Sequence, residues 1–276
     1  TGWHVGFGMQ RNPTSSGAMY CGTPQMGEYA LGTHDDSVEF NTTSWKWNYD
    51  KGWSAAKGTS QQTWAWKRGH GFDVICYTGN SGVQHIRHQL GVPAEMMWVK
   101  RKTGGSGDNW IVYHKGLNDG SNPETKYIRL NLDNTQNGDA IWDNTAPSAS
   151  HFTLGNDSAV NNSSGTYMAL LFASTRVSKV GSYIGGGSSD VTVSLGFTPR
   201  FLLIKATEAH VASWLTLDSL RGFGGSSNDP YIMLDTTTAQ NNNVNWVELS
   251  GTNMVIQGGY STTNSAGNTY IYYAHA

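Results

Sequence analysis

The feature that most constrains this chain is that its last third repeats its middle. Residues 71–100 (GFDVICYTGNSGVQHIRHQLGVPAEMMWVK) resemble residues 179–205 (KVGSYIGGGSSDVTVSLGFTPRFLLIK). The offset falls from 106 for Tyr77 and Tyr183 to 103 for Tyr167 and Tyr270. Other landmarks keep the same order: Pro93 with Pro199, Trp110 with Trp214, Tyr127 with Tyr231, and Trp142 with Trp246. We therefore expect two copies of one fold, at residues 71–176 and 177–276, each about the size of a single β-sandwich.

Both copies are built from short apolar or alternating runs bounded by turn residues. These runs include FDVICY (72–77), MMWVK (96–100), WIVYH (110–114), YIRLN (127–131), TYMALLFA (166–173), FLLIK (201–205) and TYIYYAHA (269–276). Such runs, rich in aromatic and β-branched residues, predict strands. A turn or two of helix is expected only at Ser213–Leu220. The sequence thus predicts an all-β fold with two tandem jelly-roll-like β-sandwich repeats.

Residues 1–70 form a smaller β-rich region with six tryptophans: Trp3, Trp45, Trp47, Trp53, Trp64 and Trp66. Most of the region fits the repeat poorly, but Thr63-Trp64 answers to Thr166-Tyr167 at an offset of 103. We expect this region to be the end of a preceding module. Trp45 and Trp47, like Trp64 and Trp66, are two residues apart, so in a strand each pair lines one face.

Composition and charge exclude several classes of protein. The net charge is −2 and the pI about 6.5, which argues against a nucleic-acid-binding protein. Aromatic residues make up 12% of the chain, which excludes a disordered one. Because no run of 18 apolar residues exists, no membrane insertion is expected. The first ten residues do not form a signal peptide. Cys21 and Cys76 are expected to be free thiols rather than a disulfide framework.

Motifs that carry chemistry are scarce. The sequence has no nucleotide-binding glycine loop and no G-x-S-x-G elbow. His85-x-x-His88 lies in an expected strand and points to opposite faces, so it predicts no metal site. Only six Glu are present, whereas polysaccharide-cleaving enzymes need a pair of carboxylates. Asp133, Asp139 and Asp143 group in a turn-rich loop, where calcium binding or catalysis are the alternatives to a plain loop. The prediction is a protein that is not an enzyme and holds no cofactor or metal.

A set of ordered motifs resembles one known family. FDVICYTGN, LGVPAEMMWVK, NWIVYH, YIRLN, IWDNTAPSASHFTLG and SGTYMALLFA, with the WKRGHGFDV junction, are similar to an uncharacterised repeat domain of virion proteins. That domain occurs in tail-fibre-like and receptor-binding proteins of marine and cyanobacterial tailed phages. The resemblance covers about Trp64 to Ala276. It implies a location on the virion surface, other virion proteins as partners and a homotrimer, and it brings no catalytic residues.

The remaining functional signal is compositional. The chain has 34 Gly, 27 Ser, 27 Thr and 22 Asn, and small polar side chains beside aromatic rings suit adaptable binding surfaces. The loops that differ most between the copies are residues 103–109, 117–126, 133–141, 222–229 and 235–245. We predict Phe223, Asn228 and Asn243 of these loops, together with Tyr260, as ligand-binding residues; Phe223 and Tyr260 have no aromatic partner in the first copy. The function expected is non-catalytic adhesion to a host-surface glycan or receptor. A purely structural or decoration protein is the first alternative, and a polysaccharide depolymerase the second.

Overall fold

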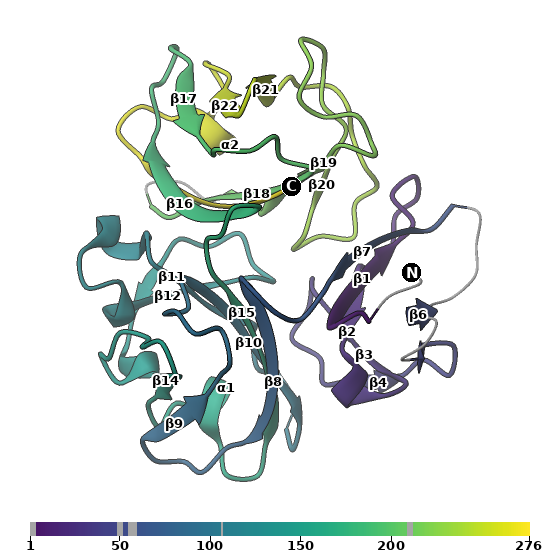
Figure 1. The fold of residues 1–276 in the computed structure, drawn as a ribbon, viewed down its shortest axis with the longest axis vertical. Coiled ribbons are helices and arrows are strands. Elements are labelled where there is room, and N and C mark those ends of the chain that lie inside the picture. Colours follow the sequence, from purple (N-terminus) through teal and green to yellow (C-terminus); the bar gives the residue numbers. More distant parts are fainter. Residues whose placement is uncertain (1–3, 49–51, 55–59, 106, 209–211) are drawn as a thin grey trace.

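The computed structural model describes residues 4–48, 52–54, 60–105, 107–208 and 212–276. Three β-rich units surround a common centre in Figure 1: the N-terminal unit in purple, the first repeat in blue and teal, and the second repeat in green and yellow. The all-β prediction is confirmed. The α-helices within these ranges, α1 (Ser158–Asn161) and α2 (Ser261–Asn264), have four residues each. Among the described residues, no helix is long and apolar enough to cross a membrane.

The first repeat has a six-stranded antiparallel sheet and a small two-stranded one. The large sheet has the order β13-β12-β11-β10-β15-β8, and the small sheet pairs β14 with β9. The strands are β8 (Phe72–Thr78), β9 (Gln84–Arg87), β10 (Met96–Thr103), β11 (Ile111–His114), β12 (Lys126–Arg129), β13 (Asn137–Gly138), β14 (His151–Leu154) and β15 (Thr166–Phe172). The 3-10 helices η2 (Leu117–Gly120), η3 (Pro123–Thr125) and η4 (Ala140–Trp142) lie in its loops.

The second repeat has the same strand order in its large sheet. That order is β20-β19-β18-β23-β16, and a three-stranded sheet, β17-β22-β21, covers one face. The strands are β16 (Ser178–Ile184), β17 (Val191–Ser194), β18 (Phe201–Ala206), β19 (Leu215–Asp218), β20 (Tyr231–Met233), β21 (Val247–Ser250), β22 (Asn253–Ile256) and β23 (Thr269–His275). The helix expected at Ser213–Leu220 is wrong, because Leu215–Asp218 pairs as β19 between β18 and β20.

The N-terminal unit has most of the same sheet. Its order is β4-β3-β2-β1-β7, and the hairpin β5-β6 forms a separate pair. The elements are β1 (Phe7–Arg11), β2 (Tyr20–Gly22), η1 (Pro24–Met26), β3 (Tyr29–Gly32), β4 (Phe40–Asn41), β5 (Lys46–Asn48), β6 (Gly52–Ser54) and β7 (Gln62–Trp66). Strands β1, β10 and β18 correspond, as do β7, β15 and β23. No described strand of this unit corresponds to β8 or β16, so β7 is the last strand of the described sheet.

Strand pairing corrects the sequence match proposed for Trp64. Trp64 pairs with Met9 of β1, and the corresponding pairs are Leu170 with Trp98 and Tyr273 with Leu203. Trp64 therefore corresponds to Leu170 rather than to Tyr167. Because neighbouring strand residues point to opposite faces, a three-residue shift also puts the side chain on the wrong face of the sheet.

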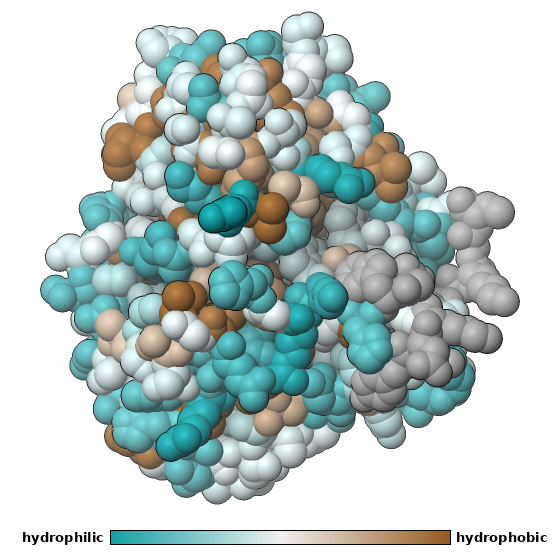
Figure 2. All heavy atoms as spheres, in the orientation of Figure 1, coloured by the Kyte–Doolittle hydropathy of each residue, from teal (hydrophilic) through white to brown (hydrophobic). Residues whose placement is uncertain are grey.

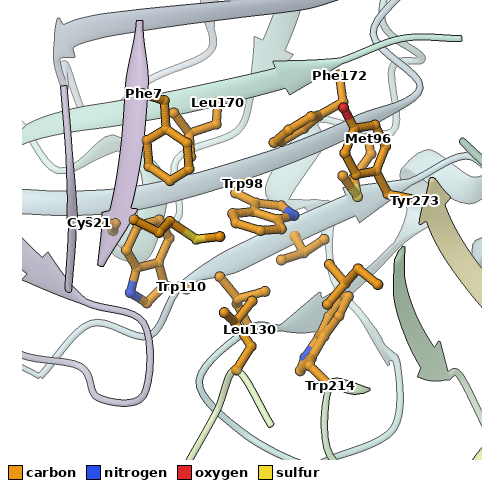
Figure 3. Packing of buried hydrophobic residues seen from close by; sticks show 14 of the residues in the cluster. Phe7, Cys21, Met96, Trp98, Trp110, Leu130, Leu170, Phe172, Trp214 and Tyr273 are labelled. Atoms are coloured by element: carbon orange, nitrogen blue, oxygen red, sulfur yellow. The ribbon is translucent and has the colours of Figure 1, made fainter. Parts of the chain in front are cut away.

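The largest hydrophobic core lies between the three large sheets and takes side chains from all of them. Figure 3 shows Phe7 and Cys21 of the N-terminal unit, Trp98 and Trp110 of the first repeat, and Trp214 and Tyr273 of the second repeat in this cluster. Strand alternation divides each sheet: Trp98 faces the shared core, whereas Val99 faces a smaller core within the first repeat. The units are thus three sheets with one common interior.

Three buried cations join the units in a closed ring. Arg11, Lys100 and Lys205 hold corresponding positions in β1, β10 and β18 and are at most 1% exposed. Each donates a hydrogen bond to a backbone carbonyl of another unit: Arg11 Nη1 to Thr236 O (3.1 Å), Lys100 Nζ to Asp36 O (2.9 Å) and Lys205 Nζ to Asp133 O (2.7 Å). The ring runs from the N-terminal unit to the second repeat, then to the first repeat, and back.

Tryptophans donate hydrogen bonds in the same rotational sense as these cations, whereas backbone amides donate in the opposite sense between the same units. Trp110 Nε1 donates to Gly32 O and Trp214 Nε1 donates to Arg129 O, both at 2.8 Å. The N-terminal unit has Met19 at the position of these tryptophans, and Met19 has no indole donor. Met233 corresponds to Gly32 and Arg129, and its carbonyl accepts a hydrogen bond from Arg11 Nη1 instead, at 3.4 Å. Three equivalent amide bonds add to these: Glu39 N to Lys102 O (3.0 Å), Gln136 N to Thr207 O (2.8 Å) and Gln240 N to Pro13 O (2.6 Å). The three units therefore share an approximate threefold arrangement.

Candidate functional site

The titratable side chains of the described residues form no group of three or more His, Cys, Asp or Glu that could hold a metal ion. Within the Asn/Asp-rich loop, Asp139 accepts a hydrogen bond from the Ala140 amide at the start of η4. The backbone carbonyl of Asp133 receives the bond from Lys205. These residues thus shape a turn and a joint between units. Both cysteines are free.

Buried carboxylates serve to fix loops. Asp229 is fully buried and accepts hydrogen bonds from the backbone amides of Gly224, Trp246 and Val247 at 2.7–2.9 Å. Burial raises the pKa of Asp229, although these amide bonds oppose the shift. Through these three hydrogen bonds, Asp229 connects the loop 222–229 to the start of β21.

Part of the predicted binding surface lies around the indole of Trp246. Asp229 holds Trp246 in place by accepting a hydrogen bond from its backbone amide. The ring of Tyr260 packs on Trp246 with centroids 5.5 Å apart and remains 36% exposed. Tyr231 meets the same indole edge-on at 5.3 Å. The Tyr231 hydroxyl donates to Oδ1 of Asn243 at 3.2 Å, and Asn243 is exposed. We call Tyr231, Asn243, Trp246 and Tyr260 the Trp246 patch.

Two of the four predicted binding residues lie outside this patch. Phe223 is only 6% exposed and belongs to the core of the second repeat, so its predicted role as a surface platform is wrong. The flanking Gly222 and Gly224 adopt positive φ angles of 106° and 96°, and this backbone conformation suits glycine. Asn228 is exposed in the same loop beside Asp229. The structure thus links Tyr260 and Asn243 through Trp246 and Tyr231, and leaves Phe223 inside.

In the tryptophan pairs of the N-terminal unit, Trp45, Trp64 and Trp66 are buried, and Trp47 is partly buried against a core cluster. Trp64 and Trp66 face the shared core together, as their spacing predicts. Trp45 lies against Trp53, with ring centroids 5.0 Å apart, and Trp47 stacks on Trp53 at 5.3 Å. Trp47 also donates from Nε1 to Gly27 O at 2.7 Å. These rings cover the outer face of the N-terminal sheet.

A second exposed aromatic pair was missed by sequence reasoning. Tyr20 of β2 and Phe40 of β4 meet edge-on with centroids 5.0 Å apart, and they are 40% and 39% exposed. The alternation of exposed Tyr20 with buried Cys21 is the sequence signal that points to it. Figure 2 shows small apolar groups scattered among neutral and hydrophilic residues on the face in view.

A family model described as Domain of unknown function (DUF7483) matches residues 26–276. No curated protein and no solved structure gave a significant match.

Proposed function

The chain belongs to the DUF7483 family, a domain of unknown function, and we propose that it is a non-catalytic adhesion module on a virion surface. Its ligand is a host-surface glycan or a receptor that carries one. The observation that carries this proposal is the Trp246 patch, in which the partly exposed ring of Tyr260 and the exposed amide of Asn243 are joined through Trp246 and Tyr231.

The chemistry of the patch fits a sugar. A pyranose offers an apolar C–H face and a rim of hydroxyl groups. The exposed face of Tyr260, held by Trp246, suits the first, and the Asn243 amide and Tyr231 hydroxyl suit the second. Because a surface ring and one amide make few contacts, we expect a dissociation constant of about 1 mM, or about 4 kcal/mol.

The virion location and the homotrimer rest on the sequence resemblance of the repeat. Several copies of the module in one fibre raise the apparent affinity of weak sites, because the second binding event becomes intramolecular. The chain has 24 Trp and Tyr residues, more than a modest core should need, and this number also favours an oligomer; many of these residues, however, are buried within the single chain. The expected trimer therefore depends on the resemblance rather than on an excess of aromatic residues.

Binding to polysaccharide tests the adhesion proposal. The purified protein is incubated with surface polysaccharides stripped from a panel of cyanobacteria and marine bacteria. We expect binding that Tyr260→Ala and Asn243→Ala each weaken at least about fivefold, or about 1 kcal/mol. Tyr20→Ala, which removes an equally exposed ring elsewhere, is the matched control and should leave binding unchanged.

Other results would redirect the proposal. Loss of binding in the Tyr20→Ala protein alone would move the site to the N-terminal unit. Absence of binding to every polysaccharide would count against adhesion and favour a structural role. Release of reducing ends would identify a depolymerase.

A further inference from the structure

The joint between the N-terminal unit and the first repeat contains a cleft. A cavity of about 500 Å³ lies there. It is lined by residues 73–76 of β8, residues 87–89 at the end of β9, Gln25 of η1 and Arg68, which lies between β7 and β8. Its volume is within the range of about 300–1,000 Å³ that small-molecule sites have.

The equivalent position at the joint between the two repeats is closely packed. Gln25 corresponds to Gly116, because each lies six residues after the corresponding Met19 and Trp110. Gly116 is buried, and a Cβ placed there would lie 2.8 Å from the Cβ of Ser182. A side chain as long as that of glutamine would not fit in that space. The cleft thus belongs to one joint and does not simply follow from the repeated fold.

Two guanidinium groups line the cleft. Arg87 is exposed, and its side chain has no hydrogen-bond or ion-pair partner among the described residues. The Arg68 side chain is 44% exposed and donates from Nε to Oδ1 of Asp73, which leaves both of its Nη groups without a partner in the described part of the chain. Asp73 is the only carboxylate among the described residues that line the cleft. Because two cations face one anion, the cleft favours a further negative charge.

The carboxylate of Asp73 connects two sides of the cleft. Its side chain is only 3% exposed. It accepts hydrogen bonds from Arg68 Nε through Oδ1 and from the backbone amide of Gln89 through Oδ2, the latter at 2.8 Å. Arg68 and Gln89 are therefore held in place before a ligand arrives, and this lowers the entropic cost of binding.

The second repeat does not share the two arginines. Strand register aligns Arg87 with Ser194. Arg68 lies five residues before Asp73, and Ser174 holds the corresponding position before β16. Because the second repeat forms the same sheet with serine at both positions, the fold does not require the arginines.

We propose that this cleft binds a glycan residue that carries a carboxylate or a sulfate ester. The forked N–H groups of an arginine match two oxygens of either anion. Gln25 and Gln89 are exposed in the same lining, and their side chains offer amide donors and acceptors to neighbouring hydroxyl groups. The Trp246 patch belongs to the second repeat, so this site goes beyond the proposed function and does not rest on it.

An acidic sugar suits the cleft better than a nucleic acid does. Nucleic acids are bound through several phosphate contacts and by stacking of bases on exposed aromatic rings. The described lining contains two arginines, and its one aromatic ring, that of His88, is buried. A single anionic group surrounded by hydroxyls matches these side chains.

Binding of charged oligosaccharides tests the cleft. The probes are an oligogalacturonate, which carries carboxylates, a sulfated dextran oligosaccharide and an uncharged dextran oligosaccharide, each titrated calorimetrically into the 276-residue protein. We expect at least one acidic probe to bind with a dissociation constant below about 1 mM, and the uncharged probe to bind at least about tenfold more weakly. Arg87→Gln should weaken the acidic probe at least about tenfold, because it removes both the charge and the fork.

Two control variants locate the binding. Lys126→Gln removes one positive charge from β12, which lies near the opposite end of the large sheet from β8, and should leave binding unchanged. Tyr260→Ala changes the Trp246 patch and should also leave binding of the acidic probe unchanged, so failure of this site is distinguishable from failure of the adhesion site. Urea unfolding should show that Arg87→Gln is as stable as the native protein, because the Arg87 side chain has no partner among the described residues.

Several results would overturn the proposal. Lack of binding by both acidic probes is one, and equal binding of the uncharged probe is another. Unchanged binding by Arg87→Gln, or equal losses in Arg87→Gln and Lys126→Gln, would show that the cleft is not the site. Tighter binding of oligothymidylate than of either acidic sugar would make a nucleic acid the ligand and refute a glycan.

Discussion

Lys205 offers a direct measure of what the buried cation ring costs. Its side chain is fully buried, and burial lowers its pKa from 10.5 to about 8, against the smaller opposing effects of Asp235 and Asp133. The folded protein thus holds this proton less tightly than the unfolded chain does. Protonated Lys205 therefore destabilises the fold. This destabilisation is fully present below about pH 8 and disappears as the pH rises to about 10.5. At about 1.4 kcal/mol per pH unit, the cost at neutral pH is about 3 kcal/mol.

The perturbation is Lys205→Met, which keeps an unbranched apolar stem and removes the titrating group. The free energy of unfolding of the native protein, minus that of the variant, should rise by about 2 kcal/mol between pH 7.5 and pH 10. The measurement is urea unfolding followed by tryptophan fluorescence at several pH values. Burial also raises the pKa of Cys21, Cys76 and Tyr77, which lowers stability at alkaline pH. Both proteins share these groups, so their effect cancels in the difference.

A second variant separates charge from shape. Lys205→Arg places at this position the side chain that Arg11 already supplies in the N-terminal unit, and an arginine stays charged throughout this range. The free energy of unfolding of the native protein, minus that of Lys205→Arg, should rise between pH 7.5 and pH 10 in the same way. A difference that is flat or falls between pH 7.5 and pH 10 in both variants would refute the reasoning that Lys205 is a destabilising buried charge.

Two further predictions concern the repeats. Tyr183→Phe removes the hydrogen bond from the tyrosine hydroxyl to Thr263 O (2.7 Å) and should lower the free energy of unfolding by about 1–2 kcal/mol. Tyr77→Phe removes the equivalent 2.8 Å bond to Val160 O and should lower it by the same amount within error. Clearly unequal losses in urea titrations would contradict equivalent roles for the two tyrosines. Residues 177–276 expressed alone should give no cooperative unfolding transition, because Trp214 and Tyr273 lose the other two sheets, whereas the whole chain should unfold in one transition by calorimetry.

The repeat made much of this fold predictable, because the residues that both copies share are those that the fold uses twice. Tyr77 stacks on Tyr167 with centroids 5.2 Å apart, and Tyr183 stacks on Tyr270 at 5.1 Å. Short aromatic and β-branched runs then gave the strands. The sequence did not show that the N-terminal unit has the same sheet. There Met19 replaces a tryptophan and Arg11 replaces a lysine, so burial and charge persist while residue identity is lost.

The candidate site was less predictable than the fold. Tyr260 and Asn243 were predicted because the two copies differ at these positions. A difference between the copies indicates a surface residue only when the loop conformation points its side chain outward. Phe223 met the same criterion, but a loop with glycines on both sides turns it inward, and the sequence does not report that direction. The place of β7 at the end of its described sheet depends on sheet order, which neither periodicity nor composition contains.

The closed cation ring also sets the order in which the molecule can be completed. Arg11 hydrogen-bonds to carbonyls of residues that lie 222 to 227 positions later in the chain. During synthesis the N-terminal unit therefore leaves the ribosome with its apolar inner face uncovered, and the part of that face that packs on Phe201 and Tyr273 stays uncovered until the second repeat has been made. Contacts of such high sequence separation form slowly, because the entropy of closing the loop must be overcome before they contribute. Folding should thus finish after translation, and a nascent chain of this kind depends on protection from aggregation for that interval.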